Sequence, residues 1–150
     1  MKKLKKQTKW RILIVGAILC SLLSVVFPVD HTNPPITGEI KAPVEVMSIL
    51  RRSCYDCHSN ETVWPWYSYV APMSWLISDD VQVGRKHMNF SEWNSYSVKE
   101  QRHTRKECGE EIEEGEMPLW FYVPLHPNSE MLPKDVETIL AWSKGTLHKE

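Results

Sequence analysis

The apolar positions form one long run near the N-terminus and several short periodic groups after it. The run extends from Ile12 to Phe27, is interrupted only by small residues and Cys20, and is followed by Pro28. It is about 16 residues long against the roughly 20 that cross a bilayer, and Trp10 and Val29 extend it toward the interfaces. Because no small-residue cleavage site follows, we expect residues 1–29 to form a transmembrane signal anchor that is retained.

The flanking charges predict the orientation of this anchor. No basic residue directly follows the run, whereas six precede it: Lys2, Lys3, Lys5, Lys6, Lys9 and Arg11. Such an excess predicts a cytoplasmic N-terminus, with residues from about 30 onward on the outer side. Lipidation of Cys20 is a weaker alternative, because Leu19 stands where a small residue is expected.

The segment 30–43 contains three prolines and Gly38 and few large apolar side chains, which predicts an extended Pro-rich tether. The domain is expected at residues 44–150. Helical patterns recur within it, and the strongest start signal is the capping box Ser97-Val98-Lys99-Glu100. The expected helices are 44–51, 72–87, 97–114 and 133–144. No strand pattern appears, so the fold class is all-α.

Charge divides between the two parts of the chain. The first eleven residues carry six positive charges, whereas the remainder has 12 Lys and Arg against 19 Asp and Glu. An acidic exported part makes nucleic acid an unfavourable partner. It favours protein partners with basic or neutral docking patches.

The most informative motif is Cys54-Tyr55-Asp56-Cys57-His58. C-x-x-C-H is the attachment sequence of a c-type haem: the thiols of Cys54 and Cys57 form thioethers with the two vinyl groups, and the His58 imidazole is the proximal iron ligand. Such haems are attached outside the cytoplasm of bacteria, which agrees with the predicted orientation. We therefore expect one covalent haem c in a periplasmic domain held at the inner membrane.

Three other roles of the cysteines compete with haem attachment. A redox dithiol usually follows a strand in a βαβ context, but the flanks here look helical. A zinc site would need two further ligands, and Cys108 stands alone. Without haem, Cys54 and Cys57 could pair as a disulfide. Cys108 itself is expected to be a buried small hydrophobe.

Met117, in the stretch Gly115-Glu116-Met117-Pro118-Leu119-Trp120 between the last two helices, is our candidate for the distal iron ligand. A thioether suits haem iron and raises its reduction potential, and Pro118 would stiffen the loop. His126 is the main rival and would give a bis-His haem. An open distal position is also conceivable, and weaker ligand candidates are Met73, Met88, His87 and His103.

Aromatic residues cluster after the motif and again beside Met117. Such rings carry large apolar areas and favour burial, so we expect some of them to cover a haem face, although filling a small core is the simpler role. The expected packing residues are Trp64, Trp66, Tyr67, Pro118 and Trp120.

Several stretches together resemble the small bacterial haem-binding domain family, which is related to class I cytochromes c. These are residues 53–62, 64–68, Pro72 with 74–76, 89–93, 114–118 and 125–127. The resemblance covers about residues 44–145. It implies a small cytochrome c-like helical domain around one haem, with its first and last helices packed together.

The leading functional hypothesis is a membrane-tethered cytochrome that transfers electrons to and from redox partner proteins. A peroxidase-like enzyme, or an accessory haem subunit of an oxidoreductase, is the second hypothesis and would need an open distal position with an acid or base such as His126. A haem-based sensor is the third. Few residues with a catalytic character are present, so an electron carrier is favoured over an enzyme.

Overall fold

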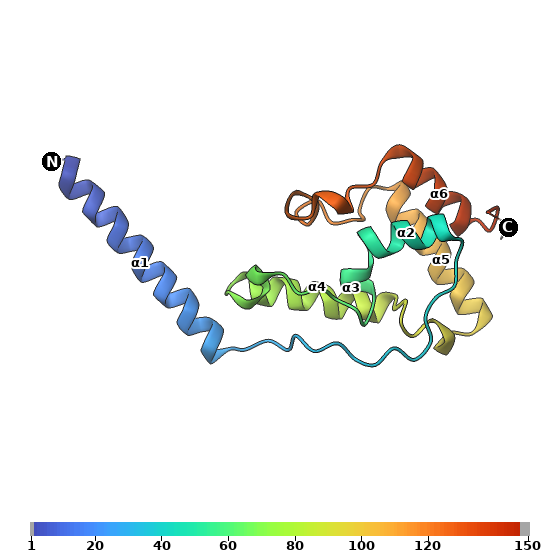
Figure 1. Ribbon diagram of the computed structural model, residues 1–150, viewed down its shortest axis with the longest axis horizontal. Helices are drawn as coiled ribbons and strands as arrows, with labels where there is room; N and C mark the ends of the chain where they lie inside the picture. The colour runs from blue at the N-terminus through green and yellow to red at the C-terminus, as the bar shows by residue number, and fades with distance from the viewer. Residues whose placement is uncertain (1, 148–150) are drawn as a thin grey trace. The chain divides into compact units, whose positions relative to one another are not determined.

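The computed structural model describes residues 2–147, and all the regular secondary structure in this range is helical (Figure 1). It contains six α-helices and four short 3-10 turns; the only bridge outside the helices in the described range joins Gly38 and Glu92. The predicted all-α class is therefore confirmed. The chain divides into two compact units, which we describe separately: the first comprises the residues up to Thr32 and Trp64–Asp80, and the second comprises Asn33–Val63 and the residues from Val81 onward.

The first unit is built on α1 (Lys2–Val26). Its segment Gln7–Val26 is long and apolar enough to cross a membrane, by length and composition. Ser21 and Ser24 donate their hydroxyls to the carbonyls of Ala17 and Cys20, four residues earlier, at 2.9 and 2.8 Å. These bonds satisfy polar groups inside an apolar helix. The helix ends before Pro28, because a proline disfavours helical geometry in the residue before it.

The same unit contains a 3-10 turn, Trp66–Tyr69, and the first half of α4 (Met73–His87). The remainder of α4, from Val81 onward, belongs to the second unit. The predicted boundaries 72 and 87 are close to those observed, since Pro72 fits the position just before a helix.

The second unit packs α2 (Val44–Ser53), α5 (Val98–Glu113) and α6 (Pro133–Ser143) around one apolar core, and α2 leads into the short helix α3 (Tyr55–His58). The contact between α2 and α6 agrees with the packing of first and last domain helices that the family resemblance implied. The most deeply buried large side chains of this core are Phe90, Leu50, Ile139 and Val46.

Two features of α5 and α6 explain how they begin and meet. The predicted capping box is present: Ser97 Oγ accepts from the Glu100 amide at 3.3 Å, and the Glu100 carboxylate accepts from the Ser97 amide at 2.7 Å. Gly109 allows close approach of the two helices, because a Cβ there would lie 2.2 Å from Ser143 Oγ. The Arg52–Asp135 ion pair, at 2.7 Å, joins α2 to the start of α6.

The stretch 33–43, most of the expected tether, is extended but packed against the second unit. We call it the N-terminal strap. The Thr37 and Gly38 amides donate to Ser91 O at 3.0 and 2.9 Å, and the Ile40 amide donates to Phe90 O at 2.8 Å. The Ile40 side chain is only 3% exposed and belongs to the core. The strap thus belongs to the second unit, which includes Asn33–Val63. The division into a tether at 30–43 and a domain at 44–150 stays a prediction.

Candidate functional site

The C-x-x-C-H motif lies at the junction of α2 and α3 in the second unit. The Cys54 amide donates to Leu50 O at 2.9 Å, which ends α2, and Cys54 O accepts from the amides of Cys57 and His58 at 3.2 and 2.9 Å. The motif is therefore a helical turn in which the two thiols and the imidazole occupy positions i, i+3 and i+4. Residues with this spacing share one face of a helix, so the three groups project to the same side.

The His58 imidazole is held in one tautomer. Its Nδ1 lies 3.1 Å from Met88 O, and since a carbonyl can only accept, Nδ1 carries the proton. Burial lowers the pKa of His58 below its ordinary value, although the hydrogen bonds to backbone oppose this shift. Neutral imidazole with Nδ1 bonded to a carbonyl presents the lone pair of Nε2, the form that binds iron.

The segment that follows α4 fixes the position of His58. The Phe90 amide donates to His58 O at 2.8 Å, and the two rings lie 6.2 Å apart. Gly84 of α4 approaches the motif closely, because a Cβ there would lie 2.7 Å from Cys57 O. A larger residue at position 84 would displace the backbone at Cys57, directly before His58.

None of the four cysteines, which all lie in the described range, forms a disulfide. Burial, together with the neighbouring Cys108 and Cys57, raises the pKa of the Cys54 thiol. Burial also raises the pKa of Cys108 to about 12, and Glu111 adds to the shift. Cys108 is 8% exposed and belongs to the core, as expected for a small hydrophobe.

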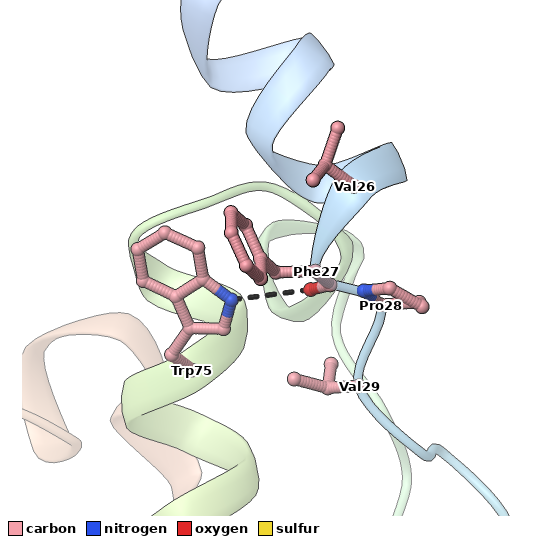
Figure 2. Close-up of a pocket in the computed structure, with 5 residues that line it drawn as sticks. All are labelled: Val26, Phe27, Pro28, Val29 and Trp75. Atoms are coloured by element: carbon pink, nitrogen blue, oxygen red, sulfur yellow. Dashed lines mark hydrogen bonds between the residues drawn. The ribbon is translucent and has the colours of Figure 1, made fainter.

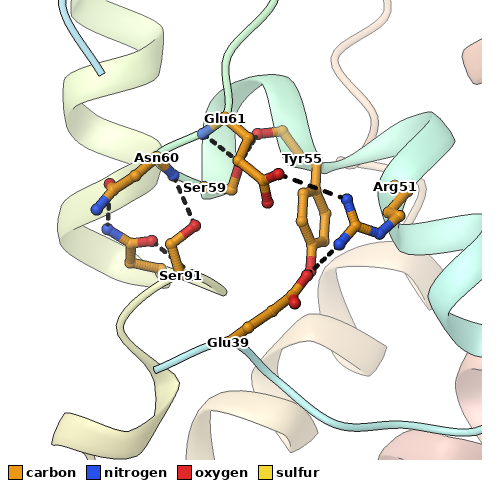
Figure 3. Close-up of polar contacts among 8 residues, drawn as sticks. Glu39, Arg51, Tyr55, Ser59, Asn60, Glu61 and Ser91 are labelled. Carbon is orange, nitrogen blue, oxygen red and sulfur yellow. Dashed lines mark hydrogen bonds and ion pairs between the residues drawn. The ribbon is translucent and has the colours of Figure 1, made fainter. Parts of the chain in front are cut away.

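Tyr55, the first variable residue of the motif, connects the motif to the N-terminal strap. Its buried ring stacks on Phe90 with centroids 5.1 Å apart, and its hydroxyl donates to Glu39 of the strap at 3.1 Å. Arg51 lies over the same ring at 4.7 Å and pairs with both Glu39 and Glu61 (Figure 3). Burial and the carboxylate of Glu39 raise the pKa of Tyr55, so its hydroxyl stays a donor.

Asn60, two residues beyond His58, is the centre of a buried polar network. Its amide donates to Ser91 Oγ at 2.9 Å, and its Nδ2 donates to Pro35 O of the strap and to Glu92 Oε1 at 2.9 and 3.2 Å. Its Oδ1 accepts from Asn89 Nδ2 at 2.9 Å. The network fixes the chain leaving the motif, and Figure 3 shows its bond between Asn60 and Ser91.

Asp56, the second variable residue of the motif, connects it to the loop between α5 and α6. One carboxylate oxygen accepts from the Val63 amide at 3.0 Å, and the other accepts from the Tyr122 hydroxyl at 2.6 Å. Sequence reasoning missed the structural roles of Tyr55, Asp56, Asn60 and Tyr122. The partners Asp56 and Tyr122 are 66 positions apart, and no periodicity links them.

Met117 lies where the chain reverses after α5. Gly115 has a φ of +77°, a conformation that favours glycine, and the amides of Glu116 and Met117 both donate to Glu111 O, at 3.0 and 3.2 Å. The Met117 side chain is half-buried and packs against the same core cluster as Cys54.

His126 is positioned by Tyr122. The two rings stack with centroids 3.9 Å apart, and His126 Nδ1 lies 3.1 Å from Tyr122 O. Because Tyr122 also bonds Asp56, the loop that carries both distal-ligand candidates is joined to the motif at this point. The geometry leaves Met117 and His126 as alternatives.

The five expected packing residues are divided between the units. In the second unit, Pro118 is half-buried, whereas Trp120 is 83% exposed. Trp64, Trp66 and Tyr67 belong to the first unit. Contact of any of the five with haem stays a prediction.

The donor set of the second unit fits a covalently attached haem. Two cysteines that form no disulfide and a neutral imidazole lie in one helical turn, and a thioether and a second imidazole lie on the loop that is hydrogen-bonded to the motif. Within the described part of the chain, no group of three or more His, Cys, Asp or Glu side chains is arranged to hold a metal ion.

Comparison with known families gives one result: residues 18–145 match the haem-binding domain family. No curated protein and no solved structure matches the chain significantly. The match extends over most of the chain and includes all the candidate ligands. This protein therefore belongs to the haem-binding domain family.

Proposed function

We propose that the protein is a membrane-anchored c-type cytochrome with one haem attached covalently to Cys54 and Cys57. The observation that carries the proposal is the geometry of the motif: Cys54, Cys57 and His58 lie in one helical turn closed by hydrogen bonds to Cys54 O, and the Nδ1 proton of His58 is held by Met88 O at 3.1 Å. A bound haem would supply a one-electron Fe(III)/Fe(II) couple. The chain supplies the proximal imidazole and an apolar surround.

Met117 is proposed as the distal ligand. Its thioether is half-buried against the core, and the turn at Gly115 orients the loop that carries it. Two fixed axial ligands limit rearrangement when the redox state changes, which suits an electron carrier better than an enzyme.

We further propose that the haem domain lies on the outer side of the bacterial inner membrane. The apolar helix Gln7–Val26, with six Lys and Arg before the apolar run and none directly after it, supports this orientation. An anchor raises the local concentration of the domain near membrane oxidoreductases. The acidic domain favours redox partners with basic docking patches.

The decisive experiment tests covalent attachment. The full chain is expressed with a cytochrome c maturation system, and haem is extracted from denatured protein with acidified organic solvent. The wild type is expected to keep its haem, whereas Cys54→Ala/Cys57→Ala should release all of it. Cys20→Ala/Cys108→Ala is the matched control and should behave as the wild type. Complete extraction of haem from the wild type would refute the proposal.

A second experiment assigns the distal ligand. The near-infrared band of thioether–iron ligation should be present in the wild type, absent in Met117→Ala and unchanged in His126→Ala. The reverse pattern would assign His126. Rapid binding of carbon monoxide by the wild type would instead favour an open distal position and the enzyme hypothesis.

A further inference from the structure

An uncharged aromatic segment of the first unit contains none of the residues proposed to attach haem or bind its iron. No charged residue occurs between Glu61 and Asp79. This stretch nevertheless carries five aromatic rings: Trp64, Trp66, Tyr67, Tyr69 and Trp75. We call residues 64–76 the aromatic segment.

The aromatic segment is bonded to the last turn of α1. The Ala71 amide donates to Ser24 Oγ at 2.8 Å, and Trp75 Nε1 donates to Phe27 O at 3.2 Å. The rings of Phe27 and Trp75 meet edge to face with centroids 6.3 Å apart. Figure 2 shows Trp75 beside Phe27 where the helix gives way to Pro28 and Val29, around a shallow apolar pocket.

His31, just beyond the helix, provides a second attachment. Its Nε2 lies 2.8 Å from Ser68 O, its ring stacks on Tyr69 at 4.1 Å, and Trp64 meets it edge-on at 4.7 Å. Together with the bonds at Ala71 and Trp75, these contacts hold the segment against the end of α1.

This attachment fixes the depth of the segment relative to the anchor. Ser24 precedes the end of α1 by two residues, about 3 Å along the axis at roughly 1.5 Å per residue. If Gln7–Val26 crosses the bilayer, the bonded turn lies at the level where hydrocarbon meets headgroups. Trp and Tyr are enriched at that level, because each ring combines an apolar body with a polar tip.

The segment also leaves large apolar side chains uncovered. Trp66 is 79% exposed and Tyr69 is 54% exposed, and Val70, Trp75 and Leu76 are each between 37% and 42% exposed. Clustered exposure of this kind marks a surface that binds a partner or a membrane. A lipid interface fits best, because the cluster is continuous with an apolar helix and contains no charge.

We propose that the aromatic segment inserts into the headgroup boundary of the bilayer beside the anchor and forms a second membrane contact of this protein. The inference rests on the proposed membrane anchoring of α1. Its ligand is the interface of phospholipids in general, since the segment has no cation to select anionic headgroups.

The test is photocrosslinking to lipid. The haem-loaded full chain is prepared with p-benzoylphenylalanine replacing Trp66 and reconstituted in nanodiscs of phosphatidylethanolamine and phosphatidylglycerol. Ultraviolet irradiation followed by mass spectrometry measures lipid adducts. The matched control replaces Trp120, which is 83% exposed in the second unit, and a third variant replaces Val15 within α1. A far-ultraviolet circular dichroism spectrum equal to that of the wild type reports that each variant is folded.

Position 66 should give several-fold more lipid adduct than position 120, and position 15 should also give adduct. Lipid adduct at position 15, with no more adduct at position 66 than at position 120, would overturn the inference about the aromatic segment. The proposed anchoring of α1 would not be affected by that result. No adduct at 15 would overturn the anchoring and the inference with it. Replacing phosphatidylglycerol with phosphatidylcholine should leave the adduct at 66 unchanged, whereas a severalfold loss would contradict contact with lipid in general.

Discussion

The two units use aromatic side chains in different ways. In the second unit, Phe90 is fully buried and lies among the rings of Tyr55, His58 and Trp93. In the first unit, Trp66 has most of its surface exposed, in a segment that is bonded to the end of an apolar helix. Clustered aromatic residues therefore identify apolar surface in a sequence, but they do not say whether that surface is buried in a core or stays exposed. The following predictions test this contrast.

The largest difference is expected between a core ring and an exposed ring. Phe90→Ala removes a fully buried ring from the core and should lower the free energy of unfolding by about 3–5 kcal/mol. Trp66→Ala in detergent should change it by less than about 0.5 kcal/mol, because an exposed side chain loses little packing. Chemical denaturation followed by far-ultraviolet circular dichroism measures both values. Similar losses would contradict the contrast.

A smaller loss is expected from the polar network around the motif. Asn60→Ala removes the side-chain bonds to Pro35, Asn89 and Glu92 and should cost about 1–3 kcal/mol, since buried partners lose their hydrogen bonds. Release of Pro35 should also expose the N-terminal strap to limited proteolysis. Asn128→Ala, at an exposed position, is the control. Equal protease resistance in the two variants would show that Asn60 does not hold the strap.

The contact between the motif and the ligand loop should have a more modest effect. Tyr122→Phe removes the hydroxyl that donates to Asp56 at 2.6 Å and should cost about 1–2 kcal/mol. It should also weaken the thioether–iron band, because the loop is held less firmly. Tyr69→Phe removes a hydroxyl from an exposed ring of the first unit and should leave the band unchanged. The same band intensity in both variants would argue against a positioning role for Tyr122.

The smallest expected effects on stability come from the ionisation of one carboxyl group in each unit, Glu100 and Asp80. Ionisation stabilises the fold at Glu100 and destabilises it at Asp80. Hydrogen bonds with Ser97 lower the pKa of Glu100 below 4.5 in the folded protein. The ionised carboxylate therefore stabilises the fold above pH 4.5, and this stabilisation is lost as the pH falls through the pKa of the folded state. Burial, followed by Asp79, raises the pKa of Asp80 above 3.8. The protonated Asp80 carboxyl therefore contributes fully to folding stability below pH 3.8, and this contribution is lost as the pH rises through the pKa of the folded state.

Melting temperatures at two pH values test this pair. Glu100→Gln should lower the melting temperature slightly at pH 7, whereas Asp80→Asn should raise it slightly. Both differences should shrink at pH 3. Changes of the same sign at pH 7 would contradict the opposed shifts.

Much of the local structure was predictable from the sequence. The capping box at Ser97, Pro133 in the first turn of α6 and the apolar run before Pro28 are short-range signals, and each of the three helices formed where expected. The spacing of Cys54, Cys57 and His58 also indicated the chemistry, because ligand spacing within one helical turn is itself a local property. Membership of the haem-binding domain family agrees with that interpretation.

The tertiary structure alone decided which distant residues support these elements. The bonds from Asp56 to Tyr122, from Asn60 to Pro35 and from Ala71 to Ser24 each join positions between 25 and 66 residues apart. Single hydrogen bonds between distant residues leave no periodic trace in a sequence, because they depend on how the helices pack. For the same reason, only the fold could show that the strap is packed and that the aromatic segment is bonded to the end of α1.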